Sequence, residues 1–258
     1  MEFSEITGLS IVFICVMIFL AGFIDSIAGG GGIISLPAYL FIGLPAHQAY
    51  GCNKFSSACG TTLSTVRFFI NGTLDLKVAL IAAAGSFIGS GIASKIVLML
   101  DEQVLKAMLL VLLPIVAIVI ICKRNFGSEN LVSQLNNKRK WILAAAIGLL
   151  IGGYDGLFGP GTGTFAIFAF SILMKYDLKT ASGNAKVLNL ASNYASVITF
   201  AFAGTILYQV AIPAAICGIA GNYIGAGLAI KRGAAFIRPM MIVVMTLLLG
   251  KIVFDFLF

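Results

Sequence analysis

Long apolar runs recur along the whole chain, and they constrain its fold more than any other feature. The first covers 8–28, and comparable runs return through all 258 residues. About 18 apolar residues in a row are enough to cross the hydrocarbon core of a bilayer. Charged residues make up 10% of the sequence, whereas a soluble domain usually has about 25%. We therefore predict an all-α polytopic membrane protein, and not a soluble protein with a large core.

The positive charges predict how the chain is oriented in the membrane. The formal net charge is +7, and Lys and Arg gather in two short connections, 123–140 and 231–238. Cytoplasmic loops of membrane proteins are enriched in these residues, so we attribute the basic balance to topology and not to nucleic-acid binding. The residues before the first run, 1–5, are acidic, unlike the start of a signal peptide. We expect that run to be a retained helix.

Ten apolar elements can be drawn, five on each side of a polar connection. They cover approximately 8–28, 33–43, 47–71, 77–99, 103–121, 141–158, 163–174, 180–204, 207–230 and 238–257. The second element of each half is too short for a straight crossing of about 20 residues. We expect one compact membrane domain with a first repeat (1–122), a cytoplasmic connection (123–140) and a second repeat (141–258).

The two halves share polar residues and glycines at the same spacing. The motif Gly22-x-x-Asp25-x-x-x-Gly29-x-Gly31 recurs as Gly152-x-x-Asp155-x-x-x-Gly159-x-Gly161. The motif Ala49-x-Gly51-x-x-Lys54 recurs as Ala181-x-Gly183-x-x-Lys186. Five crossings per half would insert the second copy upside down, with the basic connections inside and the N-terminus outside. If the short elements re-enter instead, each half has four spans and the repeat is parallel. We favour the inverted repeat.

Glycine-rich breaks interrupt the apolar runs at matching places, 29–32 and 159–164. Broken backbone at membrane depth must find partners in protein or in a wet cavity. Paired breaks are typical of transporter sites, where the N–H groups of the next half-helix face an anion. A glycine-rich packing seam is the alternative. From these breaks we assign to substrate binding Gly30, Gly31, Gly161, Thr162, Gly163 and Thr164.

Each half also places a lysine and polar side chains on one helix face. The second-half face carries Lys186, Asn189 and Asn193; the first-half face carries Lys54, Ser57 and Thr61, with Asn53 adjacent. These offsets share one face of a helix. A lysine in hydrocarbon is costly, so we predict that both faces line a cavity for a small oxyanion. Lys54 is the weaker case because it lies nearer its helix start. A snorkelling lysine or a structural ion pair is the alternative.

Asp25 and Asp155 stand just before the two glycine breaks. Three roles remain open for them. They can couple transport to a proton or cation, neutralise a nearby lysine in a salt bridge, or cap a helix end.

These motifs resemble the TauE/SafE family of sulfite and sulfonate exporters. The resemblance rests on the first glycine run with Pro37, on Gly51-x-Asn53-Lys54, and above all on the segments 159–164 and 181–193. It covers nearly the whole chain. It implies a multi-pass protein of a prokaryotic inner (plasma) membrane and a sulfur-containing anion as substrate, with family members in both export and uptake. It does not identify the substrate of this chain.

We therefore predict a secondary transporter of a small organosulfur or sulfur-oxyanion substrate, of the sulfite, thiosulfate or sulfonate class, and not an enzyme. An uncoupled anion channel or an assembly subunit is the alternative. An intramembrane aspartyl enzyme is less favoured because the chain has no Gly-x-Gly-Asp motif. We expect no cofactor and no metal site. The expected partners are a small anion, the lipid bilayer and a coupling proton or cation, and a homo-oligomer is compatible with the sequence.

Overall fold

The computed structural model describes residues 7–101, 103–104, 127 and 129–257, without the side chains of 245 and 247–257. Its helices are α1 (Gly8–Ala28), α2 (Gly32–Phe41), α3 (Ala46–Ile70), α4 (Leu76–Met99), the short 3-10 helix η2 (Val132–Gln134), α6 (Asn137–Leu157), α7 (Thr162–Leu173), α8 (Leu178–Phe202), α9 (Tyr208–Arg232) and α10 (Ala234–Leu257). No strand occurs in the described residues. The all-helical prediction is confirmed, and every predicted element but one coincides with a helix. The exception, 103–121, lies almost entirely outside the described residues.

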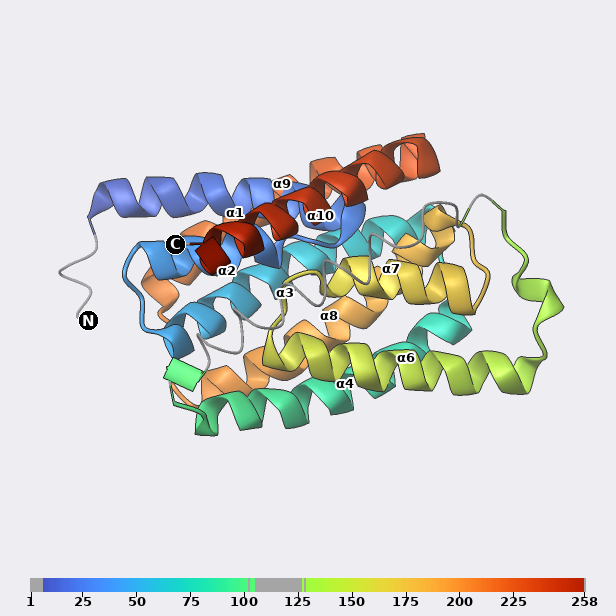
Figure 1. Cartoon of the computed structure of the whole chain (residues 1–258), viewed down its shortest axis with the longest axis horizontal. Helices are drawn as coiled ribbons and strands as arrows, with labels where there is room; N and C mark the ends of the chain where they lie inside the picture. Colours follow the sequence, from blue (N-terminus) through green and yellow to red (C-terminus); the bar gives the residue numbers. More distant parts are fainter. Residues whose placement is uncertain (1–6, 102, 105–126, 128, 258) are drawn as a thin grey trace.

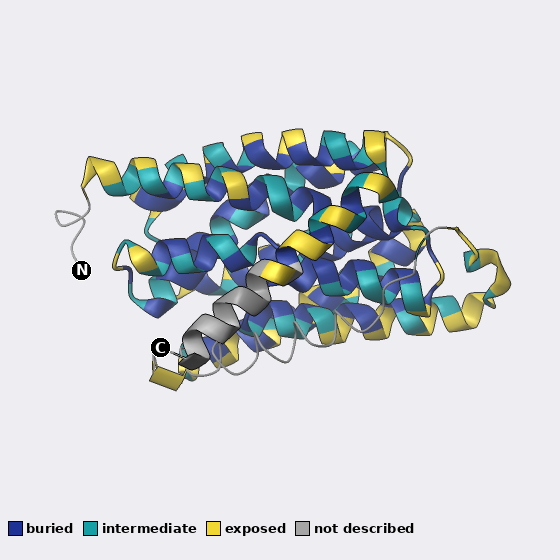
Figure 2. Ribbon diagram, turned by 45° about the horizontal axis from the view of Figure 1, so that its top comes forward, coloured by how far each residue is buried: buried dark blue, intermediate teal, exposed yellow. Residues whose placement is uncertain are grey.

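Apolar helices form the outside of the bundle, and polar helices form its centre. Within the described ranges, α1, α4, α6 and α9 are long and apolar enough to cross a membrane. Exposed residues lie along these helices, as the colours of Figure 2 show, and many of them are large apolar residues. The two 25-residue helices α3 and α8 carry most of the buried polar residues and pack against each other. The chain is a multi-pass membrane protein whose polar groups face protein and not lipid.

In each half, the first helix packs against a helix of the other half. α1 packs along α9, and its counterpart α6 packs along α4. Glycines allow the close approach: a Cβ on Gly221 would lie 2.1 Å from the Phe19 carbonyl oxygen, and one on Gly148 would lie 2.1 Å from that of Ala82. Small residues let membrane helices pack backbone to backbone. The two contacts correspond to each other under the internal duplication predicted from the sequence.

The short helices turn back and do not cross. The ring of Phe41, at the end of α2, lies 5.3 Å from that of Phe13, near the start of α1. α2 therefore returns to the end of the molecule where α1 begins, and α7 returns in the same way beside α6 (Figure 1). With 10 and 12 residues, these helices are about 15 and 18 Å long at ~1.5 Å per residue, which is roughly half a bilayer. α1 with α2 and α6 with α7 thus form two re-entrant hairpins. The prediction of ten full crossings is wrong for both of them.

The counterpart helices α1 and α6 run in opposite directions, and so do α3 and α8 (Figure 1). Re-entrant hairpins therefore occur together with counterpart helices that run in opposite directions. From the sequence we expected re-entrant elements only in a parallel repeat. The start of α1 and the connection that carries η2 lie at opposite ends of the bundle (Figure 1). These directions agree with an inverted repeat, which stays a prediction together with the outward N-terminus.

Candidate functional site

The two glycine breaks cross each other inside the bundle. A Cβ on Gly29 would lie 2.2 Å from the carbonyl carbon of Gly163, and one on Gly163 would lie 2.4 Å from the Cα of Gly29. Gly29 has φ 78°, a left-handed conformation that ends α1, and glycine adopts it without steric cost. The backbone N–H of Thr164 donates to Gly29 O at 3.0 Å, and its hydroxyl donates to Ala28 O at 2.8 Å. The breaks thus satisfy part of each other's backbone and fix where α1 and α7 meet.

The lysine of each half pairs with the aspartate of the other half. Lys54 Nζ lies 2.7 Å from Asp155 Oδ2, and both side chains are 2% exposed. The Ser192 hydroxyl donates to the same carboxylate oxygen at 2.6 Å. The Lys54 ammonium also lies 3.5 Å from Asn193 Oδ1. Both charges are therefore fully enclosed and have several partners, as buried ions require.

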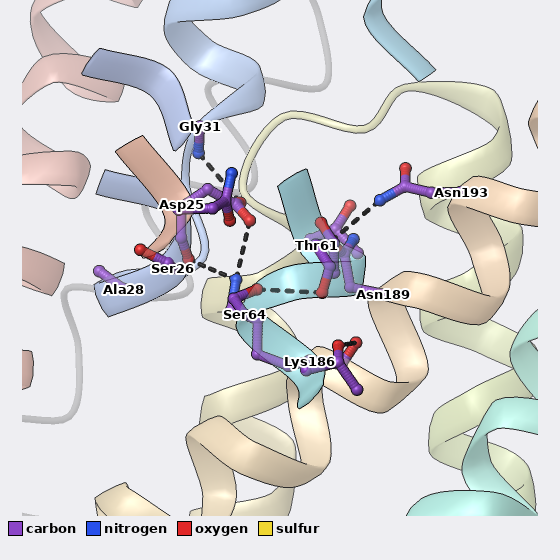
Figure 3. A network of polar contacts seen from close by, with 12 residues as sticks. Asp25, Ser26, Ala28, Gly31, Thr61, Ser64, Lys186, Asn189 and Asn193 are labelled. Carbon is purple, nitrogen blue, oxygen red and sulfur yellow. Dashed lines mark hydrogen bonds and ion pairs between the residues drawn. The ribbon is translucent and has the colours of Figure 1, made fainter. Parts of the chain in front are cut away.

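The second pair is more open. Lys186 Nζ lies 2.8 Å from Asp25 Oδ2 and also donates to the Asp25 carbonyl oxygen. The Lys186 side chain is 1% exposed, but that of Asp25 is 19% exposed. The other carboxylate oxygen accepts one long hydrogen bond, 3.3 Å, from Gly31 N; Figure 3 shows Asp25 between these two partners. At both sites, therefore, the aspartate forms a salt bridge with a lysine, which is one of the three roles that the sequence left open.

Polar side chains of α3 and α8 form a chain beside the ion pairs. Asn193 Nδ2 donates to Asn189 Oδ1 at 3.2 Å, and the Thr61 hydroxyl donates to the same oxygen at 3.5 Å (Figure 3). Asn189, Asn193 and Thr61 are all buried. Each of these groups has several hydrogen-bonding positions. The amide and hydroxyl groups can therefore replace a hydrogen bond to one another with one to a ligand.

These groups surround a cavity of about 40 Å³ at the centre of the bundle. One water needs roughly 10–15 Å³ by this measure, so the cavity suits a few waters or a small ion. Its polar walls come from the two breaks and from α3, α8 and α9, and include Asp25, Gly31, Ser35, Asn53, Lys54, Ser57, Thr61, Asp155, Asn189, Asn193 and Asn222. The two lysines and two aspartates around it cancel in charge.

The cavity contains most, but not all, of the residues assigned from sequence. The residues that do not line it are Gly30, Gly161, Thr162, Gly163 and Thr164. Gly163 and Thr164 form the crossing with Gly29, whereas Gly30 faces Val244 of α10. Lys186 does not line it either, since its ammonium is held behind Asp25. Of the two lysines, therefore, only Lys54 lines the cavity, although its position near the helix start made it the weaker candidate in the sequence.

Several polar wall residues, among them Asn222, Ser35 and Ser56, were not predicted from the sequence. Asn222, on α9, sits where the first half has Ser86 and lies outside the matched lysine and aspartate motifs. Its amide nitrogen fills space left by two glycines, because a Cβ on Gly60 or Gly22 would come within 2.3 or 2.6 Å of it. Only the tertiary structure shows that this asparagine lies opposite glycines of α1 and α3.

Comparison with known proteins agrees with this architecture. The model of the family "Sulfite exporter TauE/SafE" matches residues 14–252. A probable membrane transporter protein, ORF9, of Sinorhizobium sp is 34% identical over 95% of this chain and 93% of its own length. A probable membrane transporter protein of Haemophilus influenzae is 32% identical, over 92% of each chain. The probable membrane transporter protein YfcA of Escherichia coli K12 is 30% identical over 92% of this chain and 87% of its own.

No solved structure matches the chain significantly. The family match covers both glycine breaks, both ion pairs and all the walls of the central cavity. The chain belongs to the sulfite exporter TauE/SafE family.

Proposed function

We propose that this membrane transporter moves a small sulfur oxyanion or organosulfonate through the central cavity. The observation that carries the proposal is the pair of reciprocal lysine–aspartate bridges between the halves, placed where two broken helices cross. Paired breaks at the interface of two repeats are typical of secondary transporter sites. The relatives' names support transport, and the family's name points to sulfite. A prokaryotic inner membrane is the proposed location.

The Lys54 side of the cavity supplies the positive wall for the anion. Lys54 borders the cavity, and the amide and hydroxyl groups of Asn189, Asn193 and Thr61 lie beside it. An oxyanion is recognised by such donors when they converge in a water-poor site. The N-terminal end of α2, at Gly31 and Gly32, reaches the same cavity and adds the positive end of a helix dipole.

Charge balance then makes coupling necessary. Each ammonium already has a carboxylate partner, so an anion that enters alone leaves its own negative charge uncompensated in a low-dielectric site. A buried unpaired charge is strongly unfavourable. A proton or a cation must therefore accompany the anion, and Asp25 is the carboxylate placed to respond because it is more exposed than Asp155.

Flux measurements in proteoliposomes test the proposal. Sulfite, thiosulfate and a simple sulfonate should each be compared with sulfate and chloride, with and without a proton or sodium gradient. We expect saturable uptake of at least one sulfur anion that responds to a cation gradient, and Asp25→Asn should weaken that response. The matched variant Lys77→Met removes an exposed charge on α4 and should behave like the wild type.

Two outcomes contradict the proposal. Flux that never saturates and ignores both gradients would identify an uncoupled channel. Wild-type protein that transports none of the sulfur anions would refute the substrate class.

A further inference from the structure

Two buried carbonyl oxygens in the cavity have no partner. Asn222 Oδ1 and Asn53 Oδ1 make no hydrogen bond within the described residues, although each residue is 3% exposed. Both residues line the central cavity. A buried polar atom without a partner is unfavourable, so water or a cation in the cavity must compensate these oxygens. A fully deprotonated oxyanion cannot do so, because it offers only acceptors.

The orientation of the Asn222 amide follows from its partner. Its Nδ2 donates to Gly218 O at 3.0 Å. Turning the amide over would place two acceptor oxygens against each other, which the hydrogen-bond network excludes. The glycines at positions 22 and 60 make room for this amide, so the free oxygen is held in place and does not swing away.

A third oxygen completes the acceptor side of the cavity. Among the described residues, Asp25 Oδ1 accepts only the 3.3 Å bond from Gly31 N, and a carboxylate oxygen has capacity for more. Asp25 also stands in the last turn of α1, where the negative end of the helix dipole favours a cation. It lies one turn after Gly22, which contacts Asn222. The acceptors therefore come from α1, α3 and α9 and line the same cavity as the Lys54–Asp155 bridge.

We propose that the cavity holds a sodium-ion site formed by Asp25, Asn53 and Asn222. Oxygen ligands from a carboxylate and two amides suit a hard cation. A divalent ion would call for more carboxylates, and the described residues hold no cluster of three or more His, Cys, Asp or Glu side chains. The site goes beyond anion transport and stands on its own oxygens, whatever the transported anion is.

The site gives a physical form to coupling. A sodium ion at these oxygens and a singly charged anion beside Lys54 would leave the cavity neutral, whereas either alone would not. The two ligands should therefore bind cooperatively and move in the same direction across the membrane.

Thermal unfolding of the purified full chain in sodium gluconate and in choline gluconate, at equal ionic strength and without any candidate substrate, tests the site. We expect saturable stabilisation by sodium. Asn222→Ser, which installs the residue found at the matching position of the first half, should weaken sodium binding about tenfold or more, as loss of one ligand does. Asn53→Ala, which removes the other unpartnered amide oxygen of the cavity, should weaken sodium binding as well.

The matched control is Asn71→Ser. Asn71 is exposed and also donates its amide to the carbonyl four residues earlier, Arg67 O, at 2.8 Å, so it reproduces the local bond without the cavity. This control should keep wild-type sodium binding. Equal stabilisation by sodium and choline would show that the cavity holds only water and would overturn the site. Sodium binding that neither Asn222→Ser nor Asn53→Ala alters would overturn it as well. Neither result depends on whether sulfur anions are transported.

Discussion

Removing one lysine at a time should separate an enclosed ion pair from an exchangeable one. Lys54→Met keeps the length of the side chain and leaves the Asp155 carboxylate, 2% exposed, with the hydroxyl of Ser192 as its remaining partner. Breaking a buried pair in this way costs about 3–5 kcal/mol. At roughly 2–4 °C per kcal/mol for a chain of this size, the expected fall in Tm is about 6–20 °C.

Lys186→Met should cost less. It leaves Asp25, whose side chain is 19% exposed, with Gly31 N as a donor and the cavity as a source of water or cation. We expect a loss of stability smaller than half of that caused by Lys54→Met. The assay is thermal unfolding of each purified variant in one detergent and one salt, and Lys77→Met, on the exposed face of α4, should stay within about 0.5 kcal/mol of the wild type.

The double variant Lys54→Met/Asp155→Asn completes the cycle. Because it removes both charges, it should recover most of the stability lost in Lys54→Met. The reasoning is refuted if the two lysine variants lose the same stability, or if the double variant is no more stable than the single one.

Two further predictions concern the topology and the crossing of the breaks. In a background without other cysteines, Thr7→Cys should react with an impermeant thiol reagent from outside and Ser133→Cys only from inside; reaction of both from one side would contradict the inverted repeat. Gly29→Ala should destabilise the protein by about 2–4 kcal/mol, from positive φ plus overlap with the second break, whereas Gly72→Ala, which has positive φ but open space around it, should lose only about 1 kcal/mol in the same unfolding assay.

The sequence predicts the elements of this fold well, because each is a local property. The lengths of the apolar runs and the positions of the glycines predict the helices almost to their ends. A bilayer stabilises continuous apolar helices, and a glycine in the left-handed conformation ends a helix. The repeated spacing of aspartate, glycine and lysine also identifies the central residues, because an ionised group inside an apolar run needs an enclosed partner.

Which lysine meets which aspartate is decided only by the tertiary structure. The pairs join opposite halves of the chain, and the crossing of Gly29 with Gly163 sets their positions. The direction of α2 and α7 also depends on packing. After a glycine break, a short apolar helix can run onward across the bilayer or turn back, and its own sequence does not decide between the two. Asn222 enters the site for the same reason: α9 packs between α1 and α3 where glycines leave space, and side-chain contact between helices far apart in sequence leaves no periodic pattern in either one.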